Sequence, residues 1–199
     1  IVASIEQAET STELLAPHAV ILLWLGHRHS AARFFDQATA ARPERADVLL
    51  CAIAFHAEHD SDQLRLLVHS LPVADLPIAI ERMLTGVQAK YLGDHLLDIA
   101  EAVTAAIQRL DQRGRRLADK QYFKLGQLLD YTGYLQLGES GASPALIMEE
   151  SAQPIDLDLQ RRHRQSHEQL AIALLDLPAV AKDALSALCI RAQREERLD

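Results

Sequence analysis

The chain has 199 residues, a formal net charge of −8 and a pI near 5.6. An acidic chain without a basic stripe is atypical of dedicated nucleic-acid binders, so we predict no nucleic-acid partner. The longest apolar run, residues 19–25, is far shorter than the roughly 18 residues that a membrane span requires. We therefore expect a cytoplasmic protein that is not a membrane protein and has a sizeable core.

Strong helix formers dominate the composition. Alanine and leucine make up most of the apolar residues, the aromatic content is 5%, and long runs of the residues that strands prefer are missing. Cys51 and Cys189 match no metal or redox spacing, and each is expected to be a small core residue in a helix. The chain is therefore predicted to be all-α, without a disulfide framework.

The expected helices follow from apolar periodicity and from the positions of Pro and Gly. Thr10–Glu13 has the spacing of a capping box before the first helix, and Gly26 ends that helix. In the second helix, Ala31, Phe35 and Ala38 share one face. The first five predicted helices cover residues 14–25, 30–41, 45–58, 62–70 and 77–91.

The sixth predicted helix, over residues 96–110, has the clearest pattern. Its apolar stripe runs over four turns and consists of Leu96, Ala100, Val103, Ile107 and Leu110. A seventh helix over residues 117–137 is expected to be interrupted by Gly126 and Gly133.

The composition then changes to Gly, Pro, Ser and Glu over residues 138–156, which predicts a linker or long loop. An apolar island within it, residues 145–148, is expected to pack on the protein itself or to dock on a partner. Two helices over residues 157–176 and 179–197 close the chain. We therefore predict three parts: a helical-hairpin domain (1–137), the linker (138–156) and a C-terminal helical hairpin (157–199) that packs on the first domain.

Turn signals recur along the chain at nearly equal steps. They are centred on Gly26, Asp60 and Gly93, and the steps are 34 and 33 residues. Such a period is typical of helix-turn-helix repeats that stack into a solenoid with an extended concave face. The alternative is an irregular helical bundle whose hairpins are similar in length, because average helices with short loops give similar periods.

The first hairpin resembles a tetratricopeptide repeat. That family places a small residue at the turn, then Ala, an aromatic residue, Ala and Pro at fixed offsets. Here those positions hold Gly26, Ala31, Phe35, Ala38 and Pro43. The later units diverge from the pattern, with substitutions at the positions of Arg65, His69, Pro72 and Asp98.

This resemblance implies a short α-solenoid whose concave groove is lined by the first helix of each hairpin. The partner-binding residues that it implies are Trp24, Asp47, Glu58, Lys90 and Tyr91, with the two aromatic residues as anchors. For Trp24, a place in the core between hairpins is an open alternative. The implied function is a non-enzymatic protein–protein interaction module, such as an adaptor, a scaffold or a secretion or assembly chaperone, that binds a protein or peptide segment.

A histidine cluster supports an enzymatic alternative. His59 and Asp60, with His29 and His56 upstream, resemble the HD-type phosphohydrolases, all-α enzymes in which such residues bind a metal that activates water. In that family an apolar helix end precedes the His-Asp pair, whereas Glu58 precedes it here. Histidines at the solvated ends of hairpins are therefore the favoured interpretation, and we predict no metal, cofactor or catalytic residue.

Two further patterns have ordinary structural explanations. His163 and His167 have a zinc-binding spacing, but arginines surround them, so a solvated helical face is expected. The basic run from Arg109 to Lys124 is expected to complement the dipole of the sixth helix.

Overall fold

Helical hairpins build the computed structural model, which describes residues 11–59, 63–86, 94–110, 117, 119–138 and 157–195. These residues form nine α-helices and one 3₁₀ turn, with no strand among them, which confirms the all-α prediction. The α-helices are α2 (Leu15–Trp24), α3 (Arg28–Ala41), α4 (Ala46–Glu58), α5 (Leu64–Ser70), α6 (Leu76–Gly86), α7 (Asp94–Arg109), α8 (Asp119–Gly138), α9 (Leu157–Leu175) and α10 (Ala181–Glu195).

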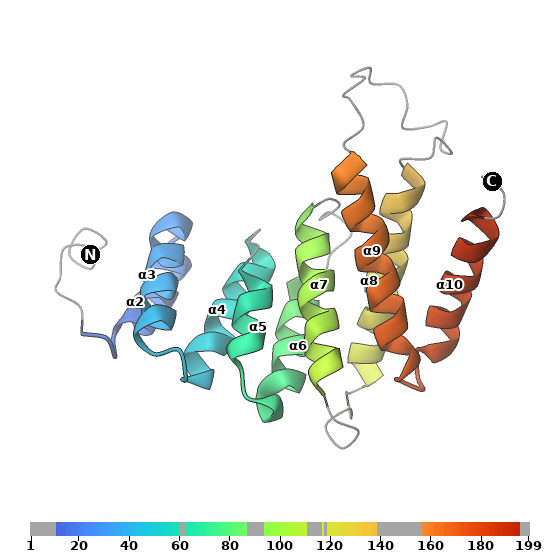
Figure 1. Cartoon of the computed structure of the whole chain (residues 1–199). Coiled ribbons are helices and arrows are strands. Elements are labelled where there is room, and N and C mark those ends of the chain that lie inside the picture. The colour runs from blue at the N-terminus through green and yellow to red at the C-terminus, as the bar shows by residue number, and fades with distance from the viewer. Residues whose placement is uncertain are drawn as a thin grey trace.

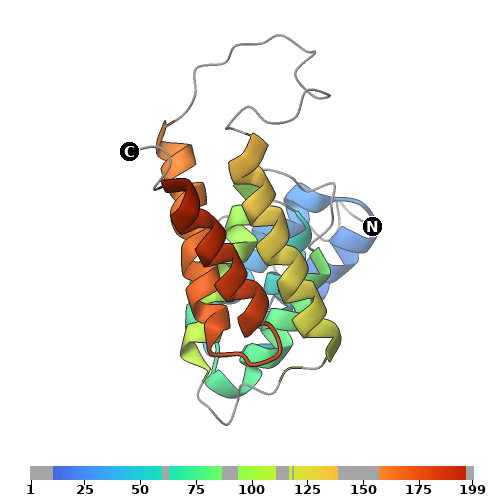
Figure 2. The same cartoon turned by 90° about the vertical axis from the view of Figure 1, so that its right-hand side faces the viewer.

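Consecutive helices pair, and the pairs stack side by side (Figure 1). The pairs are α2 with α3, α4 with α5, α6 with α7, and α8 with α9. Between pairs, α4 packs on α6 and α6 on α8 in one layer, while α5 packs on α7 and α7 on α9 in the other. Helix α10 packs on both α8 and α9 and closes the C-terminal end of the stack (Figure 2). The expected solenoid-like stack of hairpins is therefore the architecture.

The turn after α2 is a glycine-dependent C-cap. Gly26 has a φ of 84°, its N–H donates to the Leu23 carbonyl, and the N–H of His27 donates to the Leu22 carbonyl, both at 2.9 Å. This pair of bonds satisfies carbonyls that the helix end leaves open, and glycine adopts the required positive φ without strain. Asp60 and Gly93 lie outside the described residues, but the helices on either side of each pack against one another.

The capping-box prediction at the start of α2 is wrong. The helix begins without a side-chain cap, and the N–H of Leu14 instead donates to the backbone carbonyl of Ser11 at 2.9 Å. A backbone turn therefore precedes the helix. Pro17 sits in the first turn, where its missing N–H costs no intrahelical hydrogen bond.

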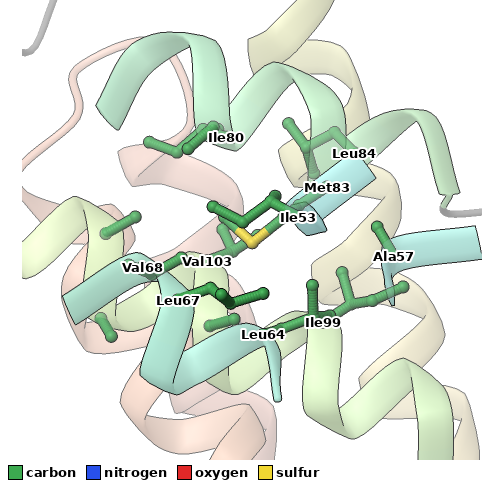
Figure 3. Close-up of a cluster of buried hydrophobic side chains, with 14 of the residues drawn as sticks. Ile53, Ala57, Leu64, Leu67, Val68, Ile80, Met83, Leu84, Ile99 and Val103 are labelled. Carbon is green, nitrogen blue, oxygen red and sulfur yellow. The ribbon is translucent and has the colours of Figure 1, made fainter. Parts of the chain in front are cut away.

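The core lies between the two layers (Figure 3). Ile53 of α4 and Met83 of α6 are fully buried, and side chains of α5 and α7 meet them from the other layer. The stripe predicted for the sixth helix is buried along its whole length. The face predicted for Ala31, Phe35 and Ala38 is buried as well. Apolar periodicity is therefore the main determinant of which helix faces meet.

Three basic side chains of the predicted basic run bind backbone carbonyls or a carboxylate of the same chain. The guanidinium of Arg109 donates to the carbonyls of Val68 and Leu71 and so caps the C-terminal end of α5, rather than serving only the dipole of its own helix. Lys120 pairs with Glu81, and Lys124 Nζ donates to the carbonyl of Leu84 at 3.2 Å. The arginines at 113, 115 and 116 lie outside the described residues.

Two other expectations are corrected. Helix α8 runs without a break through Gly126 and Gly133, because packing on α6, α9 and α10 holds it along its length. Cys189 is exposed on α10, the last helix of the stack, whereas Cys51 is partly buried.

The region predicted as a linker lies outside the described residues except for Gly138, which ends α8. None of the described helices is both long enough and apolar enough to cross a membrane.

The core arrangement predicts the effect of a cavity at its centre. Ile53→Ala removes buried methyl groups where α4 meets α6, so we expect the free energy of unfolding to fall by about 2–5 kcal/mol. Leu66→Ala on α5 is the matched control, because Leu66 is 66% exposed, and it should change stability by no more than about 0.5 kcal/mol. Urea denaturation of both variants measures the difference. Equal losses would contradict this core.

Candidate interaction surface

Helix α2 has an apolar side that faces water. Leu15, Ala19 and Leu22 are buried, but the opposite side is exposed: Trp24 exposes 89% of its surface, and four other large apolar side chains expose between 42% and 48%. Their spacing of three and four residues places them on one side of the helix. We call this surface the α2 face; it consists of Leu14, Pro17, Val20, Ile21, Trp24 and Leu25.

The α2 face is unusual because it contains no charge. Residues 14–25 include no Asp, Glu, Lys or Arg. The solvent side of a surface helix is normally polar, and the outer helix of a stacked repeat needs a polar face for solubility. Burial of Trp24 alone would contribute roughly 3–6 kcal/mol, from the area of a tryptophan side chain and its 89% exposure. The α2 face is therefore suited to contact another apolar surface.

The exposure of α2 follows from how its hairpin joins the stack. Helix α3 carries the packing against α4: the rings of Phe35 and Phe55 lie 5.2 Å apart, and Nε2 of His56 lies 4.0 Å from Oδ1 of Asp36. Helix α2 packs mainly on α3, at the N-terminal end of the stack (Figure 1). No other described helix therefore covers its outer side.

The predicted partner-binding residues have different environments. Trp24 is exposed, which excludes the alternative of a core position. Asp47 and Glu58 are both exposed at opposite ends of α4. Lys90 and Tyr91 lie outside the described residues. The described part of the predicted set thus reaches solvent on α2 and α4.

Asp47 is not an isolated charge. Arg45 holds its carboxylate through two bonds, from Nε at 3.0 Å and from Nη2 at 2.5 Å. The hydrogen bond from Arg45 lowers the pKa of Asp47. Because this neighbour already neutralises it, Asp47 contributes less net charge to the surface than Glu58 does.

The histidines considered as metal ligands lie in separate environments. His29 is exposed on α3, and His56 is buried beside Asp36, which corrects the expectation that it lies at a solvated helix end. His59 stacks on Phe55, and its Nδ1 lies 2.7 Å from the Phe55 carbonyl oxygen. Asp60 lies outside the described residues. Among the residues that the structure describes, no three His, Cys, Asp or Glu side chains come together as a metal site.

The expectation of a solvated face at His163 and His167 is wrong. Both side chains are buried, and His167 Nδ1 lies 2.9 Å from the hydroxyl oxygen of Thr132 on α8. They continue the same helix face as Leu170 and Leu174, which packs inward on α7 and α8. That apolar continuation is the signal in the sequence that predicts their burial. Of the neighbouring arginines, Arg161 and Arg164 are exposed.

A small polar cleft of about 180 Å³ lies between α5, α7 and α9. Its lining includes Ser166, whose buried hydroxyl oxygen has no hydrogen-bond partner among the described residues. No base therefore activates this hydroxyl there, and the nucleophile–base pair that covalent catalysis requires is missing from the described cleft. Its other lining residues are Arg65, Glu101, Thr104, Ala105, Gln108, Arg162, Gln165 and Gln169.

Arg162 ties α9 to α7 at the edge of this cleft. Its Nε donates to Glu101 Oε1 at 2.8 Å, and its Nη2 donates to Asp98 Oδ1 at 2.5 Å. Burial raises the pKa of Asp98 and outweighs the opposing effect of Arg162. Asp98 is therefore a partly buried carboxylate whose charge Arg162 stabilises.

Comparison of the chain with protein-family models, curated proteins and solved structures finds no match.

The Arg162 contacts predict a pH-dependent loss of stability. Arg162→Met leaves Asp98 and Glu101 without their cation, so we expect a loss of about 1–3 kcal/mol at pH 7. The pKa of Asp98 then lies further above its unfolded value, so protonation favours the folded state and the loss shrinks from pH 7 to pH 4.

Arg161→Met is the matched control, because Arg161 pairs only with the exposed Asp158 among the described residues and should contribute little. Urea midpoints at both pH values measure the two variants. A loss that is the same at pH 4 and pH 7 would contradict the assigned role of the two carboxylates.

Proposed function

We propose that this protein is a non-enzymatic protein–protein interaction module that binds an apolar segment of another chain on the α2 face. The observation that carries this proposal is the side of α2 that is exposed, apolar and free of charge around Trp24. Large aromatic residues at the centre of a patch commonly dominate binding free energy. An uncharged helix surface fits the apolar side of an amphipathic helix.

Three other features support binding rather than catalysis. The described polar cleft has a serine without a base, the described histidines have separate environments, and the described cations of the basic run bind within the fold. Each of these groups has a structural use or lacks the second residue that a reaction needs. The proposal therefore assigns the stack of hairpins the role of a rigid support.

The finer assignments belong to the same proposal. A tetratricopeptide-like solenoid that acts in the cytoplasm as an adaptor, a scaffold or a secretion or assembly chaperone would present α2 at one end of its stack. The exposed Glu58 on α4 would add charge selectivity beside an apolar contact. In this account the α2 face supplies affinity and the neighbouring helices supply specificity.

Site-specific photo-crosslinking tests the proposal. A photo-crosslinking amino acid at the position of Val20, in cells that make the chain naturally, should give one dominant protein adduct. Trp24→Ala should reduce that adduct at least tenfold, because it removes the largest contact on the face. The same amino acid at the position of Ile190, which is 51% exposed on α10, is the control and should not give the adduct.

An adduct at position 20 that persists unchanged with Trp24→Ala would count against the α2 face as the binding surface. So would the absence of any adduct at position 20 under conditions in which the chain is folded.

A further inference from the structure

We propose that the chain that occupies the α2 face is a second copy of this protein, with the two α2 helices packed antiparallel about a two-fold axis. This inference rests on the proposed function and names the partner of the same surface. It follows from three properties of the surface: its lack of charge, the charges at its two ends and its place in the stack.

The first property is the absence of charge on the face itself. In a two-fold contact between identical surfaces, a charge near the axis comes close to the same charge of the second copy, which is unfavourable when those charges are desolvated. Residues 14–25 contain no Asp, Glu, Lys or Arg, so the α2 face avoids this repulsion completely. His18 is the one titratable side chain of the helix; it is partly buried at the edge of the face and lies beside the ring of Phe34 on α3.

The second property is the opposite charge at the two ends of the helix. Glu13 precedes α2 and Arg28 follows the Gly26 turn, and both side chains are exposed. In an antiparallel pair, the end of α2 that carries Glu13 lies beside the end of the second copy that carries Arg28. The charges at the rim therefore complement one another in this orientation, whereas a parallel pair would place like charges together.

The same orientation matches the apolar residues. With the axis between Val20 and Ile21, Val20 of one copy lies opposite Ile21 of the other, and Trp24 lies opposite Pro17. Both members of each pair are exposed in the single chain. One register therefore pairs the largest side chain with the exposed proline ring, in the same antiparallel orientation that brings the opposite end charges together.

The third property is the position of α2 at one end of the stack. At the C-terminal end, α10 covers α8 and α9 and presents Lys182, Asp183 and Ser186 to solvent. The two ends of the protein therefore differ, and only the N-terminal end presents an uncharged helix face among the described helices. Contact between identical surfaces closes after two copies, so the assembly is a dimer and not a filament.

Analytical ultracentrifugation of the full chain tests the inference. We expect a concentration-dependent monomer–dimer equilibrium for the unsubstituted protein. Val20→Glu and Trp24→Glu should each raise the dimer dissociation constant at least 100-fold, because each places two carboxylates in an apolar contact. Ile190→Glu on α10 is the matched control and should leave the dissociation constant unchanged. All three positions are exposed, so the fold should survive, and circular dichroism checks this.

A charge exchange tests the antiparallel orientation. Glu13→Lys and Arg28→Glu should each raise the dissociation constant several-fold, and the variant that carries both changes should return toward the original value. Failure of the double variant to recover would overturn this orientation, even if the protein is a dimer.

A chain that stays monomeric at every concentration would overturn the second copy as the occupant. If position 20 then gives an adduct with a different protein, the proposed function stands and only this inference fails. If a monomeric chain instead becomes dimeric when residues 1–10 are removed, that segment occupies the face, and both the inference and the proposed binding surface are wrong for the full chain.

Discussion

Every apolar helix face in this protein has to be covered by a neighbouring helix. In the middle of the stack this constraint is met twice, because α4, α6 and α8 follow one another in one layer and α5, α7 and α9 in the other. Each new hairpin covers the previous one and exposes a face of its own. In a stack of this kind, the apolar helix faces that no neighbour covers lie at its ends. The surfaces at the ends therefore determine which apolar partners can bind there.

The two ends solve this problem differently. At the C-terminal end, α10 lies across both layers and turns outward a surface in which Lys182 and Asp183 accompany exposed apolar side chains. At the N-terminal end, α3 packs on α4 through Phe35 and Phe55, which leaves the outer side of α2 open. The polar contacts made by Arg109 and Arg162 tie α7 to α5 and α9 to α7 within one layer. In the proposed function the interior is a rigid support, and α2 provides the binding surface.

The sequence predicts the helices well because apolar periodicity is a local signal, and the stripe that begins at Leu96 is buried as expected. Long-range contacts are harder to predict. The arginines around His163 suggest solvent, yet packing on α7 and α8 buries that histidine. For Trp24 the sequence left core and surface open, because an apolar helix without charges looks the same in either place. Only the position of α2 at the end of the stack decides between them.

The central claim is that no other described part of the chain covers the outer side of α2. Trp24 is the only tryptophan in the sequence, so its fluorescence reports on this face alone. Iodide quenching measured on serial dilution tests the claim most directly. The account predicts that Trp24 becomes as accessible in the dilute folded protein as it is in the urea-unfolded chain. Protection from iodide that persists at every dilution of the folded protein would contradict it.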